Sequence, residues 1–191
     1  LALAARQAGD DVRLRPMFAR LLREVGAIDG IRRVRYTSPH PKDMRPDTFA
    51  AMAETAAVCE HLHYPLQSGS DRVLASMHRG YTAERYLERL VQARVTVPDL
   101  AVSTDIIVGF PGETEADFSP RAGTEAADME TEFVDPAVVN ERFERLRIVV
   151  ERAAIRKHQA RVGRIEGVLL EGPSKKDPSV ISGRTRQNKL V

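Results

Sequence analysis

The sequence has very little cysteine: Cys59 is the only one among 191 residues. A single cysteine excludes an intramolecular disulfide framework, and it excludes an iron–sulfur site made from three thiolates of this chain. This cysteine content is compatible with a reducing compartment, so we expect a cytoplasmic protein. We interpret Cys59 as a small apolar packing residue at a helix end rather than as a ligand or nucleophile.

Long apolar runs are missing as well. No stretch approaches the roughly 18 consecutive apolar residues of a membrane span, and the opening LALAA is too short for the apolar region of a signal peptide. We therefore expect no membrane contact. With 42% hydrophobic and 29% charged residues, the chain is able to bury one core with a small appended unit.

The net charge of +2 is distributed unevenly. Residues 113–135 contain eight acidic side chains and one basic side chain, which is typical of a solvated connector. Residues 163–191 contain six basic and three acidic side chains. This basic tail is the better candidate for contact with phosphate groups.

Apolar periodicity in the first 110 residues predicts the order strand, helix, strand, helix, strand. That order argues for an α/β fold with a parallel sheet and right-handed crossovers. Two of the expected helices cover 16–26 and 46–58, and two more begin after the N-caps Ser70 and Thr82. The expected strands cover 31–36, 62–66 and 100–108.

The alternation stops after residue 114. Thr114 and Asp117 look like a capping box for another crossover helix, yet a serine–proline pair follows at 119–120, too early for a helix. A parallel crossover needs a dozen or more residues, and no strand-like run precedes the long amphipathic helix expected at 138–158. We therefore expect a segment to be missing between residues 118 and 119.

Two polar loops follow strand-like runs. Residues 67–70 (QSGS) and 105–109 (DIIVG) both lie where predicted strands end. The carboxyl ends of parallel strands meet at one edge of a sheet, which is where α/β enzymes bind ligands. The two loops therefore predict one shared pocket, and we expect His40 and His63, which lie beside them, to line it. The histidines lack a metal-site pattern.

Three ordered blocks carry a family resemblance: residues 31–41 (IRRVRYTSPHP), 65–71 (PLQSGSD) and 105–114 (DIIVGFPGET). Together they resemble the radical-SAM tRNA methylthiotransferase family, in particular the branch that methylthiolates isopentenylated adenosine beside the anticodon. Residues 171–177 (EGPSKKD) and 182–191 (SGRTRQNKLV) are similar to the opening of the RNA-binding TRAM domain of this family.

The resemblance implies a fold class and a domain order. We expect an α/β fold: a partial parallel (βα) barrel of radical-SAM type in residues 1–118, an acidic connector and long helix in 119–161, and an incomplete small TRAM-like β-barrel in 162–191. Residues 119–124 resemble a block that in the family follows one more helix and strand. The comparison thus also implies an internal deletion at 118–119.

The resemblance also implies cofactors. Members of the family cleave S-adenosylmethionine reductively at a [4Fe-4S] cluster, and they hold this cluster with the pattern Cys-x-x-x-Cys-x-x-Cys. That pattern and the family's second cysteine triplet are absent from this chain, so its cluster ligands are missing and we expect no metal site. The chain therefore reads as an inactive fragment or a degenerate paralogue.

For S-adenosylmethionine the implied contacts lie in the two loops. The simpler reading is structural: Ser70 caps a helix, Gly69 turns the chain and Ile107 is a core residue. By analogy with the family, Ile107 lies against the adenine and Gly109 permits close approach. The implied cofactor-binding residues are Gln67, Ser68, Gly69, Ser70, Asp105, Ile107 and Gly109.

For tRNA the implied contacts lie in the basic tail. Its side chains are suited to phosphate neutralisation, and the absence of aromatic residues from 162–191 argues for binding by backbone and shape rather than by base reading. A solvated basic surface is the alternative. The predicted RNA-binding residues are Lys175, Lys176, Arg184, Arg186 and Lys189.

Three functions remain open from the sequence. The first is a truncated tRNA methylthiotransferase, the second is a non-catalytic RNA-binding remnant, and the third is a half-barrel enzyme for a small phosphorylated substrate. The glycine turn at 109–113 lacks the lysine and the glycine spacing of nucleotide-binding loops, which disfavours a nucleotide-triphosphate site.

Overall fold

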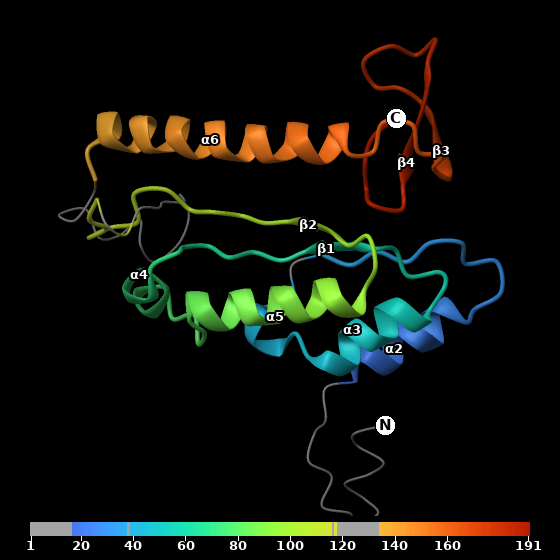
Figure 1. Cartoon of the computed structure of the whole chain (residues 1–191), viewed down its shortest axis with the longest axis horizontal. Helices are drawn as coiled ribbons and strands as arrows, with labels where there is room; N and C mark the ends of the chain where they lie inside the picture. The colour runs from blue at the N-terminus through green and yellow to red at the C-terminus, as the bar shows by residue number, and fades with distance from the viewer. Residues whose placement is uncertain (1–16, 38, 116, 118–133) are drawn as a thin grey trace, which may run out of the picture.

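The computed structural model describes residues 17–37, 39–115, 117 and 134–191 (Figure 1). At its centre is a parallel pair of strands, β1 (His61–His63) and β2 (Ala101–Ser103). Three helices lie on one side of this pair and α6 (Pro136–Gln159) lies on the other (Figure 1). The three are α2 (Phe18–Gly26), α3 (Pro46–Glu54) and α5 (Ala83–Thr96). In the described part of the chain, no helix is long and apolar enough to cross a bilayer.

The predicted helices are confirmed, with shifted ends. α2 matches the expectation at 16–26, although Pro16 lies outside the described residues. α3 begins with Pro46 in its first turn, where the missing N–H is harmless, and it ends at Glu54 rather than at residue 58. A short 3-10 helix, η1 (Pro41–Asp43), precedes α3. The two predicted N-caps are confirmed: the Ser70 side chain accepts from Val73 N at the start of α4 (Asp71–Ser76), and the Thr82 side chain accepts from Arg85 N at the start of α5.

The predicted strand at 31–36 is wrong as a full strand. Val34 makes only an isolated parallel bridge with Val58, donating to Ala57 O at 2.7 Å and accepting from Cys59 N at 3.0 Å. After α3 the chain turns through 55–57 before it extends, so Val58 is the one residue there that pairs with Val34. A ladder needs successive pairs, which are absent here.

The central pair is also shorter than predicted. Its register joins His61 to Ala101 and His63 to Ser103, and the expectation was 62–66 against 100–108. Pro65 has no N–H to donate, and Leu66 N bonds the side-chain oxygen of Thr104 at 2.9 Å instead of a backbone carbonyl. Pairing resumes only at the bridge between Gln67 and Ile106.

The core lies between the strand pair and the helices beneath it. Phe49, Leu62 and Leu74 are fully buried. The rings of Tyr64 and Tyr86 stack with centroids 4.4 Å apart, and the Tyr86 hydroxyl donates to Tyr64 O at 2.7 Å. Buried tyrosines thus both fill the core and satisfy strand carbonyls that have no ladder partner.

α6 differs from the sequence expectation in its packing. Asp135 caps it through Ala137 N at 2.7 Å, and its span fits the predicted helix at 138–158. The apolar stripe predicted for this helix is covered only in part: Val139 and Leu146 are half-buried, whereas Phe143 and Val150 are 54% and 53% exposed. Ion pairs of Arg147 with Glu144 and Glu151 support the helix surface instead.

The C-terminal segment is an antiparallel hairpin of β3 (Val168–Pro173) and β4 (Ile181–Thr185). The register shifts between Leu170 and Gly172, and Gly172 takes a φ of +107°, which an L side chain rarely adopts. Arg184 also bridges to Leu190. The described strands form an open hairpin, and its TRAM-like character remains a prediction.

Arginines fasten this hairpin to the amino end of the central strands. The Arg186 guanidinium donates to both carboxylate oxygens of Glu60 at 2.6 Å, to Val58 O at 2.6 Å and to Ala56 O at 2.9 Å. From the body, Arg33 donates to Arg184 O and to Gly167 O. The clamp therefore joins residues more than 120 positions apart in the sequence.

Replacement of the clamp tests whether it fixes the hairpin. We expect Arg186→Gln to lower the free energy of unfolding by roughly 2 kcal/mol, because it leaves the Glu60 carboxylate and two carbonyls without charged donors. Urea unfolding measures the loss, and hydrogen exchange of β4 amides reports local opening. The control is Arg32→Gln, which removes an exposed arginine from the same region. Unchanged protection of β4 in the Arg186 variant would contradict the prediction.

Candidate functional site

The structure brings the two predicted ligand loops together. Gln67 N donates to Asp105 O at 2.9 Å, and Ile107 N donates to Gln67 O at 2.8 Å. Gln67 has a φ of +69°, which turns the chain out of the strand and towards α4. The loops therefore meet beyond the carboxyl ends of β1 and β2, at the end of the molecule where α4 lies (Figure 1).

The seven predicted cofactor residues differ in accessibility. Gln67, Ser68, Ile107 and Gly109 are buried, with Ser68 at 0% exposure. Ser70 and Asp105 are half-buried, and Gly69 is exposed. The surface that these loops offer is thus made by residues 69, 70 and 105, while the rest of the set supports them from below.

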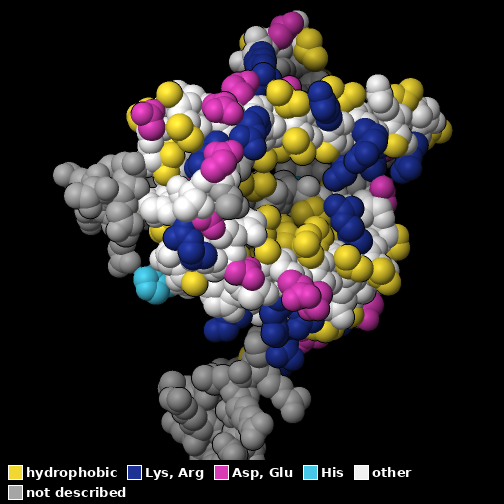
Figure 2. Space-filling view, turned by 60° about the vertical axis from the view of Figure 1, so that its left-hand side comes forward, with side chains coloured by type: hydrophobic (Ala, Val, Ile, Leu, Met, Phe, Trp, Pro, Cys, Tyr) yellow, Lys and Arg dark blue, Asp and Glu magenta, His cyan; other side chains and the backbone are white. Residues whose placement is uncertain are grey.

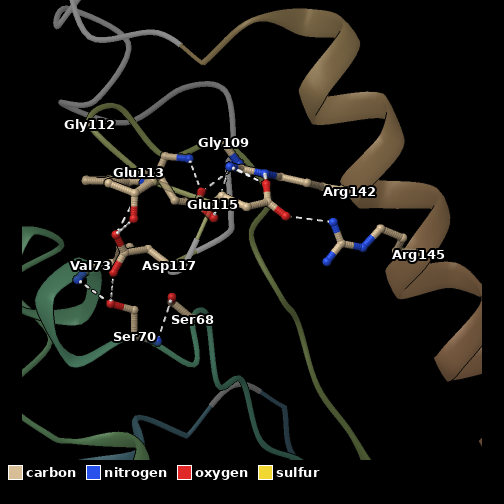
Figure 3. Close-up of polar contacts among 12 residues, drawn as sticks. Ser68, Ser70, Val73, Gly109, Gly112, Glu113, Glu115, Asp117, Arg142 and Arg145 are labelled. Atoms are coloured by element: carbon tan, nitrogen blue, oxygen red, sulfur yellow. Dashed lines mark hydrogen bonds and ion pairs between the residues drawn. The ribbon is translucent and has the colours of Figure 1, made fainter.

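A buried carboxylate organises the second loop. Glu113 accepts from Gly109 N and Phe110 N, both at 2.8 Å, and it closes the turn by donating its own N–H to Phe110 O at 2.8 Å (Figure 3). Burial raises the pKa of Glu113 to about 7. The hydrogen bond from Gly109 N and the nearby charge of Arg142 lower this pKa, but by less than burial raises it. Sequence reasoning missed this residue, although a glutamate after a glycine turn was a usable signal.

Arginines of α6 reach over this turn. Arg142, whose side chain is only 4% exposed, lies 3.7 Å from the Glu113 carboxylate and 2.9 Å from that of Glu115. Arg145 pairs with Glu115 at 2.7 Å (Figure 3). Charged side chains therefore attach the first half of α6 to the candidate site.

The amino end of α4 is occupied by an acid of the chain itself. The Ser70 hydroxyl donates to Asp117 while it accepts from Val73 N at 3.4 Å (Figure 3). A hydrogen bond from Arg72 holds the pKa of the Asp117 carboxyl well below its usual range, and smaller contributions come from the hydrogen bonds of Ser70 and Thr114. A ligand carboxylate or phosphate at this helix end would have to replace Asp117.

A strip of polar side chains runs along one face of the strand pair. His63 lies with Nδ1 3.0 Å from Ser103 Oγ and Nε2 3.4 Å from Asp105 Oδ2. His61 Nε2 lies 3.4 Å from the same serine, and burial lowers the pKa of His61, with Arg35 adding to the effect. Alternating strand positions share a face, so these side chains form one polar row that ends at Asp105. His40 packs edge-on against Tyr81, whose hydroxyl donates to Leu66 O at 2.9 Å, and its place in the pocket remains a prediction.

The residues present do not fit an iron–sulfur cluster. Cys59 is 1% exposed and lies in the core beside Val58, and the sequence has no second thiol. Among the described residues, no group of three His, Cys, Asp or Glu side chains is placed to hold a metal ion. A [4Fe-4S] cluster needs thiolate ligands that this chain does not supply.

The five predicted RNA-binding residues separate into different environments. Lys175 and Lys176 are exposed in the turn between β3 and β4. Arg184 pairs with Glu171 at 3.3 Å, and Arg186 is the clamp to Glu60. Lys189 is half-buried and lines a cavity at the amino end of β2. The hairpin turn is thus the part of the set that faces solvent most fully.

The raised pKa of Glu113 predicts a pH dependence of stability. Its pKa is about 7 in the folded protein against 4.5 as the ordinary value, so between these values the folded state binds more protons than the unfolded chain. The free energy of unfolding therefore falls as pH rises from about 5 through 7. We expect Glu113→Gln to reduce that fall by on the order of 2 kcal/mol in urea unfolding. Glu88→Gln, an exposed change on α5, is the control, and an unchanged slope for the Glu113 variant would contradict the expectation.

Comparisons with known proteins identify the family of the sequence. The sequence profile of the Radical SAM superfamily matches residues 4–120, which contain both ligand loops. A tRNA-2-methylthio-N(6)-dimethylallyladenosine synthase of Moorella thermoacetica is 44% identical over 203 residues, which cover 96% of this chain and 46% of that protein. Enzymes of the same name from Acidothermus cellulolyticus and Streptomyces coelicolor are 48% and 45% identical over 206 residues, which cover 96% of this chain and 41% of each enzyme.

Two facts follow from these alignments. The chain spans less than half the length of these curated relatives. The alignments run over 203 and 206 residues, more than the 191 residues of the whole chain, so the relatives contain residues that have no counterpart here. The predicted position of that gap, at 118–119, lies outside the described residues. With the profile covering more than half of the sequence, the chain belongs to the radical SAM superfamily.

Proposed function

We propose that this chain is the part of a tRNA methylthiotransferase that contacts the adenosyl cofactor and the tRNA, and that it is inactive without cluster ligands from outside its own sequence. The observation that carries the proposal is the pairing of Gln67 with Ile106, which joins the two ligand loops at the carboxyl end of the strands. The relatives, named as tRNA-2-methylthio-N(6)-dimethylallyladenosine synthases, support the substrate class.

The fit to S-adenosylmethionine rests on the accessible part of the loops. Asp105 offers a carboxylate that accepts hydrogen bonds from hydroxyl or ammonium groups, and Gly69 leaves the backbone open. Ile107 lies beneath them as the apolar support. When bound, the cofactor supplies the adenosyl group, and the residues of this chain bind and orient it. Since the cluster ligands are missing, no bond-breaking step is assigned to this chain.

A second function, RNA binding without catalysis, is favoured by the hairpin turn. Lys175 and Lys176 are exposed and, within the described residues, make no ion pair. Arg184 and Arg186 already bind Glu171 and Glu60, so contact with RNA phosphates falls first to the two lysines. The third function, an enzyme for a small phosphorylated substrate, finds less support, because Asp117 occupies the helix end at which a phosphate would bind.

Cofactor binding tests the first function. We expect S-adenosylmethionine to bind the full chain with a dissociation constant of about 0.1–1 mM, because the cluster that holds its amino and carboxylate groups in the family is absent. Calorimetry or ligand-observed NMR measures the affinity. Asp105→Asn should weaken binding several-fold, whereas Asp47→Asn, an exposed change on α3, should leave it unchanged. Lack of saturable binding at 5 mM, or equal loss in both variants, would rule out the pocket assignment.

Salt dependence tests the second function. We expect tRNA binding to weaken as salt rises, and the double variant Lys175→Glu/Lys176→Glu to flatten the slope of log K against log salt by about 1.5, which corresponds to two lost phosphate contacts. Fluorescence anisotropy at several salt concentrations provides the slope. Arg152→Glu, a charge reversal on the exposed surface of α6, is the control. Binding that keeps its slope in the double variant would exclude the hairpin turn as the RNA contact.

A further inference from the structure

A basic cavity lies at the amino end of β2, away from the candidate functional site. Its volume is about 290 Å³, close to the lower end of small-ligand pockets. α5, the carboxyl end of α6 and the chain after β4 surround it, and Leu100, Ala101 and Val102 form its apolar floor. Figure 2 shows, on the face it presents, a hollow with an apolar floor and Lys and Arg side chains along its rim.

The charges of this cavity are not balanced. Its lining contains five basic side chains and a single acidic one, that of Asp99. Asp99 is already engaged, since it lies 3.0 Å from Arg161 and 3.5 Å from Arg164 and accepts from Gln187 at 3.1 Å. The remaining basic side chains, Arg94, Lys157 and Lys189, make no ion pair with an acidic side chain of the described residues.

These three cations lie close enough to repel one another, with Lys189 half-buried and Arg94 and Lys157 exposed at the rim. Loss of solvent lowers the pKa of Lys157, and the charges of Arg94, Lys189 and Arg156 lower it further. The three side chains come from α5, from α6 and from the chain after β4, so the fold itself brings like charges together. Such a cluster disfavours the folded state until an anion enters it.

We propose that this cavity is a binding site for a phosphate group, held by Arg94, Lys157 and Lys189. Lysine ammonium and arginine guanidinium groups are the donors that proteins use for phosphate, the former as point charges and the latter as a planar fork. The apolar floor accommodates the carbon skeleton attached to the phosphate. Two sources share this chemistry: a phosphodiester of an RNA backbone and a free small-molecule polyphosphate.

The proposal is independent of the cofactor pocket, which lies at the other end of the strands. It is also separate from the hairpin turn, because Lys175 and Lys176 are absent from the lining. A failure at either of those sites therefore leaves this cavity to be judged by its own variants.

Thermal unfolding with pyrophosphate is the direct test. We expect pyrophosphate to raise the Tm of the full chain beyond sodium chloride of equal ionic strength, in a saturable way. Lys157→Gln and Arg94→Gln should each weaken the apparent affinity at least about fivefold, or roughly 1 kcal/mol. Without ligand, both variants should keep or raise the Tm, because repulsion is relieved. This separates a binding role from a structural one.

The matched control is Arg152→Gln, which removes a positive charge from the exposed surface of the same helix. It should bind pyrophosphate like the unaltered chain. The proposal is overturned if pyrophosphate stabilises no more than chloride does, or if Arg152→Gln loses as much affinity as Lys157→Gln. A lower Tm in both cavity variants without ligand would equally overturn it, since the three side chains would then serve the fold.

A second arm identifies the source of the phosphate. A short RNA stem–loop is titrated into the unaltered chain, the Lys157→Gln variant and the Lys175→Glu/Lys176→Glu variant. Weaker RNA binding by Lys157→Gln, together with competition by pyrophosphate, assigns the cavity to the RNA backbone. RNA binding that is unchanged in Lys157→Gln, with pyrophosphate affinity lost, assigns it to a free polyphosphate. If RNA binding is lost only in the Lys175→Glu/Lys176→Glu variant, the RNA contact is the hairpin turn, and the cavity is judged by its pyrophosphate affinity.

Discussion

The pairing of Arg186 with Glu60 is the contact on which the arrangement of the described chain depends. One guanidinium satisfies a carboxylate and two carbonyls at the point where the chain leaves α3 and enters β1. This planar set of donors fixes both the position and the orientation of the hairpin. The end of α6 is held separately, because Arg161 pairs with Asp99 at 3.0 Å and with Glu166 at 2.6 Å.

This attachment separates the two proposed binding regions along the molecule. The ligand loops lie at the carboxyl end of the strands and the hairpin lies at their amino end, and α6 runs between the two (Figure 1). A helix of 24 residues is about 36 Å long, so an RNA held at the hairpin must extend that far to reach the loops. Positioning by backbone contacts at a distance, with chemistry elsewhere, suits a partner as large as a folded RNA.

Local signals in the sequence predicted local structure well, and long-range pairing poorly. Ser70 and Thr82 begin their helices as expected, because a cap depends on a side chain and the next three residues. The strand at 31–36 was predicted from alternation alone, yet Arg33 and Arg35 point to the hairpin through contacts with Gly167, Arg184 and Thr185. Arg186 is a second example: from the sequence it was predicted to contact RNA, and in the structure it binds Glu60 and two backbone carbonyls.

The sequence predicted that the two loops meet, but it did not predict the charged groups around them. The sequence placed the loops together correctly, since strands that alternate with helices end at one edge. It did not reveal that Glu113 and Asp117 would take up the N–H and hydroxyl donors of these loops. A ligand carboxylate arriving at Ser70 must displace Asp117 from charge-assisted bonds, and these are stronger than neutral ones. The proposed cofactor contacts at Asp105 and Gly69 lie outside this set of bonds, so a ligand bound there as proposed need not compete with Glu113 or Asp117.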